Sequence, residues 1–219
     1  MSVRPGTLAR AQKTASTREQ LIDAAERLMC EGGLSALTTQ KVAKECGLAE
    51  GTIYRHFASR EELLVTTLRE RLPGEFQPHI DTLVEKAGRG SIEANLREFI
   101  ANVVPIYSII APVLGMLAAD PALAARNADA LHSDGGGPGR TLDRIAAYFR
   151  EEQRLGRIPG DVDARTAAGM LVGFCFYRSL IQHLFREDPT QLTDDGLSRE
   201  LARILGRGVE AAASQPLRS

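Results

Sequence analysis

Apolar residues recur along this chain at the three- and four-residue spacing of amphipathic α-helices. After Thr17, residues Leu21, Ala25 and Leu28 fall on one face, and Gly32-Gly33 is expected to end the helix. No run of alternating β-branched residues predicts a strand. The pattern therefore favours an all-α protein, with helices at about 17–31, 39–46, 50–56, 59–72, 76–87, 92–110, 121–132, 140–155, 163–186 and 195–213.

Capping and breaking residues divide the chain further. Thr17-x-x-Gln20 and Ser59-x-x-Glu62 have the spacing of capping boxes, and Pro73-Gly74 is expected to end or kink the helix that the second box opens. The segment Gly135–Gly139 reads as a flexible loop. We expect a flexible basic arm over 1–16, an N-terminal three-helix helix-turn-helix domain over 17–62, a C-terminal helical bundle over 63–213 and a tail over 214–219.

The composition is typical of a globular chain, with 25% charged and 43% hydrophobic residues among 219. The net charge of -1 conceals a basic N-terminal part, because residues 1–60 contain nine Lys and Arg against six Asp and Glu. A basic end on an acidic body suits a protein that presents this end to a polyanion.

No enzyme or metal motif stands out in the sequence. Cys30, Cys46 and Cys175 are far apart, and Gly135–Gly139 lacks the Lys-Ser/Thr pair and the preceding strand of a phosphate-binding loop. We therefore expect no catalytic residues, no metal and no cofactor. The longest apolar run, at about 167–177, is shorter than the roughly 20 residues of a membrane span, and the N-terminus lacks the apolar core of a signal peptide. These features predict a cytoplasmic protein with no membrane partner.

Residues 38–57, TTQKVAKECGLAEGTIYRHF, have the pattern of a helix-turn-helix with Gly47 at the turn. Ile53 and Phe57 are i, i+4 partners that are expected to face inward, which turns Gly51 and Arg55 outward. An outward arginine can donate to a guanine edge or a phosphate, and hydroxyl and imidazole donors can reach phosphates. The candidates for DNA contact, with two basic residues of the arm included, are Thr38, Thr39, Gln40, Gly51, Thr52, Tyr54, Arg55, His56, Arg60, Arg10 and Lys13.

Several of these candidates have a purely structural alternative. Tyr54 can serve as a core or hinge residue, and His56 can cap or pack locally. Arg10 and Lys13 can form a solvated tail, although basic arms often touch DNA in the bound state.

The segment 17–65 resembles the TetR (tetracycline repressor) family. The residues that match the family pattern in register are Thr38, Val42, Ala43, Cys46, Gly47, Leu48, Gly51, Thr52, Ile53, Tyr54, His56, Phe57 and Leu63. The resemblance implies phosphate or base contacts for Thr38, Thr52, Tyr54, His56 and Arg60. Two positions depart from the pattern: Ala49 replaces the usual capping Ser, which costs about 0.5–2 kcal/mol of local helix stability, and Glu50 adds a negative charge that can instead read a cytosine amino group.

The resemblance further implies a C-terminal domain for dimerisation and ligand sensing. The helices at about 163–186 and 195–213 are expected to pair with their copies in a four-helix homodimer interface, and Pro105 is expected to kink the helix at about 92–110 and leave room for a ligand. Core packing is the alternative for both features. The candidate ligand-binding residues are Phe99, Asn102, Val103, Tyr107, Met116, Phe149, Phe174 and Tyr177.

Taken together, these features predict a ligand-responsive DNA-binding transcriptional regulator and not an enzyme. By resemblance it is a repressor that binds a palindromic double-stranded operator as a homodimer and is released by an unknown small apolar or amphipathic molecule. The alternatives are a constitutive, non-sensing DNA-binding protein and a transcriptional activator of the same fold.

Overall fold

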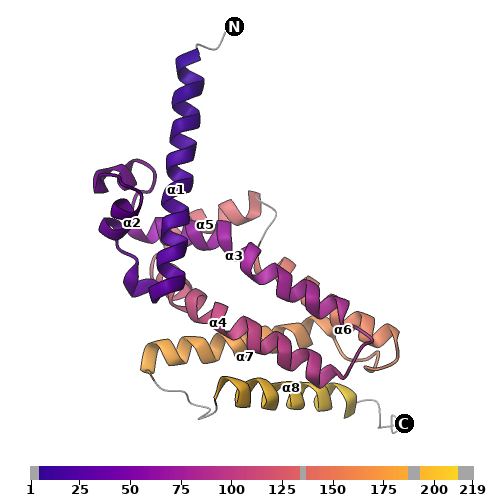
Figure 1. The fold of residues 1–219 in the computed structure, drawn as a ribbon. Helices are drawn as coiled ribbons and strands as arrows, with labels where there is room; N and C mark the ends of the chain where they lie inside the picture. The colour runs from indigo at the N-terminus through magenta and orange to yellow at the C-terminus, as the bar shows by residue number, and fades with distance from the viewer. Residues whose placement is uncertain (1–4, 134–136, 187–192, 212–219) are drawn as a thin grey trace. The chain divides into compact units, whose positions relative to one another are not determined.

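The computed structural model describes residues 5–133, 137–186 and 193–211, and every regular element in these ranges is a helix (Figure 1). The expected all-α fold is thereby confirmed. In chain order the elements are α1 (Pro5–Ala36), α2 (Thr39–Glu45), the 3₁₀-helix η1 (Glu50–Arg55), α3 (Arg60–Glu85), α4 (Ile92–Ala119), α5 (Pro121–Ser133), α6 (Pro138–Arg154), α7 (Ala164–Phe185) and α8 (Asp194–Ala211). The chain divides into two compact units, the first made of 1–72 and 113–127 and the second of 73–112 and 128–219.

Helix α1 begins at Pro5, not at Thr17 as the sequence predicted. Proline suits the first helical position because its missing N–H would have no partner there, and the Leu and Ala residues that follow are good helix formers. Thr17 therefore lies inside a helix and does not cap it, and residues 5–16 of the predicted arm are helical. Residues 1–4 of that arm and the predicted tail lie outside the described residues.

Gly33 ends the regular part of α1, as the sequence predicted, because its φ of 66° and ψ of -172° are not helical; a short helical segment follows to Ala36. The prolines of α3 and α4, in contrast, lie inside their helices. Helix α3 continues through Pro73-Gly74 to Glu85 and so joins the two helices expected at 59–72 and 76–87. Pro73 and Gly74 are exposed, so water can bind the carbonyl group that loses its N–H partner, which lowers the cost of the proline.

The later helices agree closely with the predicted positions. Helix α4 begins at Ile92 as expected but runs through Pro105 and Pro112 to Ala119, well past the predicted end at 110. The Asp120 carboxylate accepts the N–H of Leu123 at 2.9 Å and caps α5. The predicted loop at 135–139 falls partly outside the described residues, because the structure resumes at Gly137 and α6 already begins at Pro138.

Aliphatic side chains of α1, α2 and η1 form the core of the first unit. Leu21, Ile22, Val42 and Ile53 are fully buried, and Leu63 closes the core from α3. Helix α1 was expected to turn Leu21 and Ala25 inward, and both are completely buried. The apolar positions that recur at helical spacing in the sequence therefore form the core of the helix-turn-helix domain.

The second unit contains an aromatic cluster and a buried polar cluster. Phe76 of α3 packs edge-on against Phe99 and Tyr107 of α4, with ring centroids 6.3 and 5.5 Å apart, and Tyr107 meets Phe176 of α7 at 6.5 Å. Burial in this cluster raises the pKa of the Tyr107 hydroxyl well above its usual value. This phenol therefore stays protonated, a hydrogen-bond donor inside an apolar region.

The buried polar cluster holds the turn between α3 and α4. The Asn95 amide donates to the carbonyl groups of Lys86 and Arg89 at 3.2 and 2.9 Å. The Gly88 N–H donates to the fully buried carboxylate of Glu152 at 3.2 Å, and Arg157 approaches that carboxylate at 3.2 Å. The turn is therefore fixed by side chains of both α4 and α6.

Helix α4 is long and apolar enough to cross a membrane by length and composition alone. A helix that ended at 110, as predicted from the sequence, would lack the apolar residues from Ala111 to Ala119. In the second unit Leu96, Ile100 and Val103 of α4 are completely buried among neighbouring helices. The core helix of a water-soluble protein has this same length and composition.

Candidate nucleic-acid interface

Helix α2 and η1 form the expected helix-turn-helix of the first unit. Thr38 is the N-cap of α2, and its hydroxyl accepts the N–H of Lys41 at 3.2 Å. The turn passes through Gly47, whose φ of 66° lies in the left-handed region that glycine adopts without strain. The N–H of Leu48 then donates to the carbonyl of Ala43 at 2.8 Å, which closes the turn.

The recognition segment is a 3₁₀-helix over Glu50–Arg55, whereas the sequence predicted an α-helix over 50–56. Ala49 offers no side-chain cap, and the N–H of Thr52 instead reaches the Ala49 carbonyl at 2.9 Å, the tighter spacing of a 3₁₀ turn. Loss of the family's capping residue therefore coincides with a tighter, less regular helix.

The inward and outward faces of η1 are those that the sequence predicted. Ile53 is completely buried, and Phe57 is 3% exposed. On the opposite side Gly51 and Arg55 are exposed, and Tyr54 is 54% exposed, too far out for the alternative role of a core residue. Thr52 and His56 are half-buried beside them. The first unit therefore presents a small polar surface around Tyr54 and Arg55.

Thr39 and Glu50 contact each other between the two helices. Thr39 is buried, and its hydroxyl donates to the Glu50 carboxylate at 2.5 Å. This bond draws Glu50 toward the N-terminus of α2, where a negative charge is favourable. The Glu50 carboxylate thus has a role within the fold. The phosphate contact expected for the Thr39 hydroxyl requires that this bond break.

Arg60 also has partners within the first unit. Its Nε donates to the Leu37 carbonyl at 2.8 Å, and its Nη1 lies 3.7 Å from the Glu61 carboxylate. Half of the predicted capping box is present, because the N–H of Glu62 donates to the Ser59 hydroxyl at 3.1 Å. The Glu62 carboxylate accepts the N–H of Ala58 at 2.8 Å, and not that of Ser59. Arg60 therefore holds the α1–α2 connection to the start of α3, and a DNA contact for it stays a prediction.

The remaining DNA candidates differ in their surroundings. Thr38 and Gln40 are exposed at the start of α2. Arg10 and Lys13 lie within α1, and their side chains fall outside what the structure describes. Sequence reasoning missed Lys41 and Lys44, which are exposed one turn apart on α2. Their three-residue spacing on the side away from Val42 was the signal that could have identified them.

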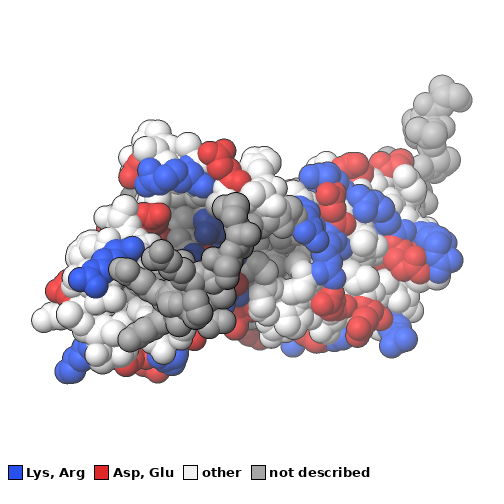
Figure 2. All heavy atoms as spheres, turned by 90° about the horizontal axis from the view of Figure 1, so that it is seen from above, with Lys and Arg blue, Asp and Glu red and all other residues white. Residues whose placement is uncertain are grey.

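Lys and Arg side chains near the helix-turn-helix differ in whether an acidic side chain pairs with them. On the face seen in Figure 2, Lys and Arg side chains are interspersed with Asp and Glu among the residues that are described. Lys41, Lys44 and Arg55 form no ion pair with any described residue, whereas Arg27 is paired with Glu45 at 2.6 Å. These three cations of α2 and η1 are therefore available to a polyanion.

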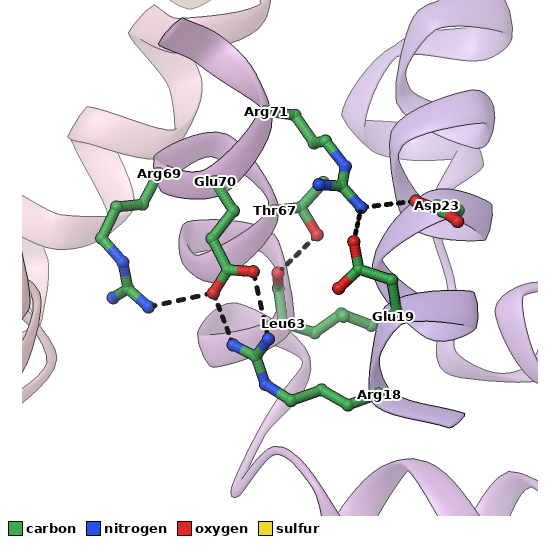
Figure 3. Close-up of polar contacts among 8 residues, drawn as sticks. All are labelled: Arg18, Glu19, Asp23, Leu63, Thr67, Arg69, Glu70 and Arg71. Atoms are coloured by element: carbon green, nitrogen blue, oxygen red, sulfur yellow. Dashed lines mark hydrogen bonds and ion pairs between the residues drawn. The ribbon is translucent and has the colours of Figure 1, made fainter. Parts of the chain in front are cut away.

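Reciprocal ion pairs join α1 to α3 behind this surface (Figure 3). Arg18 of α1 makes a two-pronged bond to Glu70 of α3, at 3.0 and 2.5 Å. Arg71 of α3 lies 2.5 Å from both Glu19 and Asp23 of α1. Hydrogen bonding to Arg18 lowers the pKa of the Glu70 carboxyl below its usual range. Because its folded-state pKa is depressed, Glu70 stabilises the fold above the unfolded pKa of about 4.3, and this contribution is lost as the pH falls through the folded value.

The structure brings together only some of the candidate ligand-binding residues. Phe99 and Tyr107 share the aromatic cluster of the second unit with Phe76 and Phe176, two rings that sequence reasoning missed. The buried residues among the candidates are Phe99, Val103, Tyr107 and Phe149. Phe76 repeats at helical spacing with the buried Ile80 and Leu83, and this periodicity was the signal for it.

Four of the predicted ligand contacts lie outside the aromatic cluster. Asn102 is exposed on α4, and Tyr177 is 49% exposed on α7 with the half-buried Phe174 beside it, at 6.4 Å between ring centroids. Met116 packs in the first unit against the cluster of Val65, Val113 and Leu123. Asn102 and Tyr177 therefore do not supply polar groups to the aromatic cluster, because each is on the protein surface.

Helix α7 has two apolar faces, one buried and one exposed. Leu171 and Cys175 are completely buried, and burial raises the pKa of the Cys175 thiol to about 12. The large apolar side chains that remain between 49% and 65% exposed on α7 and α8 are Met170, Tyr177, Leu184, Phe185 and Ile204. The α8 stripe is partly internal, because Leu197 and Leu201 are buried within the protomer. The exposed face therefore lies mainly on α7.

A helix-turn-helix with an exposed basic recognition face defines a class of DNA-binding protein, and known proteins identify the family. Residues 21–66 match the model of bacterial regulatory proteins of the tetR family. The fatty acid metabolism regulator protein of Bacillus subtilis is 34% identical over 68 residues, 31% of this chain and 35% of that protein. An uncharacterised HTH-type transcriptional regulator of Mycobacterium tuberculosis, MT1294, is 30% identical over 147 residues, 63% of this chain and 73% of that protein. The chain belongs to the TetR family of transcriptional regulators.

Solved structures support the same fold over nearly the whole chain. The transcriptional regulator FadR of Bacillus subtilis, in complex with stearoyl-CoA, superimposes with a TM-score of 0.59 and 21% identity, over 87% of this chain and 98% of that one. Identity this low shows the fold alone. The sequence match to the fatty acid metabolism regulator protein of Bacillus subtilis spans only about a third of that protein's length.

Proposed function

We propose that this protein is a homodimeric repressor that binds a palindromic operator and is released from it by a small apolar or amphipathic molecule. The observation that carries the proposal is the outward face of η1 and α2, where Tyr54, Arg55, Lys41 and Lys44 are exposed while Ile53 anchors the segment in the core. Arg55 has the donors to read a guanine edge, and Thr38 with the lysines has donors for phosphates.

Dimer formation supplies the second half of the contact surface. One helix-turn-helix makes few contacts, and two of them about 34–36 Å apart would meet successive major grooves on one side of the duplex. The exposed apolar side chains of α7, with Gly169 and Gly173 among them, suit a close helix-to-helix interface. A Cβ added at either glycine would meet no atom within 4 Å in the protomer, so both positions leave room for a partner helix.

The aromatic cluster of the second unit is the proposed effector site. Phe76, Phe99, Tyr107 and Phe176 offer apolar ring edges, and the Tyr107 hydroxyl remains a donor because its pKa is raised. A long-chain acyl-CoA is the first compound to test, since a regulator of the same fold binds stearoyl-CoA. We expect the effector to bind preferentially to a conformation in which the two recognition segments of the dimer have a different spacing. The coupling between effector and operator binding would then weaken operator affinity by about 1–3 kcal/mol.

Exchange of single residues on η1 separates base reading from phosphate contact. We expect Arg55→Ala to weaken binding to a selected operator by about 1–3 kcal/mol and to relax preference at one base position. Tyr54→Ala should weaken binding to all duplexes by a similar factor, because a phosphate contact carries no sequence information. Anisotropy titrations against the operator and its single-base variants measure both effects. An equal loss on every duplex for Arg55→Ala would assign Arg55 to a phosphate instead.

The effector is tested by release of the same operator. Stearoyl-CoA should lower operator affinity several-fold, and Tyr107→Phe, which removes only the hydroxyl, should weaken this response while apo-protein binding is unchanged. Octanoyl-CoA, with the same head group and a shorter chain, is the control for a nonspecific effect of the nucleotide. If operator affinity is unchanged by every compound that is shown to bind the second unit, the constitutive, non-sensing alternative is favoured.

A further inference from the structure

Arg18 touches two different parts of the first unit at once. Its two terminal nitrogens bond the two carboxylate oxygens of Glu70 at 3.0 and 2.5 Å. The Cζ atom of the same guanidinium lies 5.6 Å from the centroid of the Phe57 ring, within the range of a cation–π contact. One α1 side chain therefore connects the α3 helix to the residue that follows the recognition segment.

Phe57 fixes the end of that segment. Its N–H donates to the Ile53 carbonyl at 2.9 Å, and its ring is almost completely buried. Tyr54 and Arg55 lie on the turn that this bond closes. Because η1 is a short 3₁₀-helix without a side-chain cap at Ala49, its own hydrogen bonds hold it weakly, and its orientation depends on how its ends are anchored.

The bond between Arg18 and Glu70 makes the guanidinium a rigid anchor. A two-pronged carboxylate bond fixes the plane of the guanidinium, which lysine cannot reproduce. Glu70 is held in turn by Arg69, whose nitrogen lies 3.4 Å away, and Figure 3 shows the carboxylate between the two arginines. The position of the Phe57 ring is thereby set relative to α3 by groups that cannot turn independently.

We propose that Arg18 is a positioning residue of the DNA-reading surface, which sets the orientation of η1 through the Phe57 ring from its anchor on Glu70. The proposal rests on the function proposed above. It predicts that Arg18 governs discrimination between DNA sequences without touching DNA itself.

Arg71 provides a matched control. It joins the same two helices through Glu19, Asp23 and Glu26, at 2.5, 2.5 and 3.3 Å. Its ion-pair partners among the described residues all lie on α1, and none belongs to α2 or η1. Loss of Arg71 therefore removes cross-links between α1 and α3 but leaves the anchor of the recognition segment in place.

The experiment compares Arg18→Met with Arg71→Met. A duplex is first selected from a random-sequence pool with the wild-type protein, and each variant is titrated against it and against a random duplex of equal length, over a series of salt concentrations. We expect Arg18→Met to weaken binding to the selected duplex by about five- to tenfold and to change binding to random DNA by less than about twofold. The salt dependence should stay unchanged, and Arg71→Met should leave the ratio of the two affinities as in the wild type.

A double variant tests whether Arg18 acts through its contact with the Phe57 ring. In a Phe57→Leu background, where the ring is absent, Arg18→Met should have no further effect on the ratio, since the two substitutions interrupt one contact. Arg18→Lys, which keeps the charge but not the two-pronged bond, replaces Arg18→Met if the latter does not fold, and should again lower the ratio. Thermal unfolding of every variant reports the stability of the fold separately.

Three outcomes would overturn the proposal. Equal ratios for Arg18→Met and Arg71→Met would mean that Arg18 only stabilises the fold. A salt slope reduced by about one on both duplexes would mean a direct phosphate contact. If the wild-type protein selects no sequence, both the proposed function and the positioning role are refuted. If the wild-type protein selects a sequence but Arg18→Met leaves the ratio of the two affinities unchanged, only the positioning role is refuted.

Discussion

Tyr177→Glu is expected to convert the protein from a dimer to a monomer at micromolar concentration. Tyr177 is at the centre of the exposed apolar face of α7, between Met170 and Leu184, and two-fold symmetry would place its copy on the partner's equivalent face. Burial of an unpaired carboxylate twice in one interface should raise the dimer dissociation constant about a hundredfold or more. Sedimentation equilibrium measures the constant directly.

A second variant excludes an effect on the fold of the protomer. Gly173→Leu should weaken the dimer as well, since the added side chain meets nothing within the protomer at its Cβ but would enter the space of a partner helix. The stability of the isolated protomer should be unchanged or higher, because leucine favours a helix more than glycine. Leu114→Glu, at an apolar position on α4 that is 41% exposed against 49% for Tyr177, is the control and should remain dimeric. A dimer that survives both α7 substitutions would place the interface elsewhere.

Arg157→Met is expected to lower the free energy of unfolding by about 3 kcal/mol. Arg157 faces the completely buried Glu152 carboxylate and donates to the Gly90 carbonyl at 2.7 Å. The Glu152 Oε2 atom has no aligned hydrogen bond among the described residues, so its contact with Arg157 is one of charge alone. Removal of the guanidinium leaves a buried, uncompensated charge in the second unit.

Arg154→Met is the matched control for this prediction. Arg154 pairs with Glu151 one residue from Glu152, but both partners are exposed and screened by water. Urea unfolding should therefore show little change for Arg154→Met and a clearly lower midpoint for Arg157→Met. Equal midpoints for the two variants would show that Glu152 does not depend on its partner.

The sequence predicted the helix-turn-helix well because local signals determine it. The inward positions of Ile53 and Phe57 follow from helical periodicity, and the cap at Thr38 and the turn at Gly47 follow from residue preferences within a few positions. The helical type of η1 was predicted wrongly, because the absence of a cap at Ala49 was treated as a loss of stability and not as a change of geometry.

The features that could not be predicted from the sequence depend on packing between residues far apart along the chain. Pro73 was expected to end or kink a helix, but α3 continues through it to Phe76, Ile80 and Leu83, which are buried in the second unit. The buried partners of Glu152 and the ring contacts of Phe76 join residues far apart along the chain. The same limit applies to Arg18, whose partners Glu70 and Phe57 are set by the packing of three elements.

The most direct test of the central claim is a titration of the purified protein with the DNA upstream of its own gene, at stated salt and with random DNA as competitor. The predicted result is saturable binding with two protomers per site, tighter than binding to random DNA by a factor of about 10³ or more. Failure to bind any duplex, even at low salt where phosphate contacts are strongest, would contradict the assignment of the α2–η1 surface as a DNA reader.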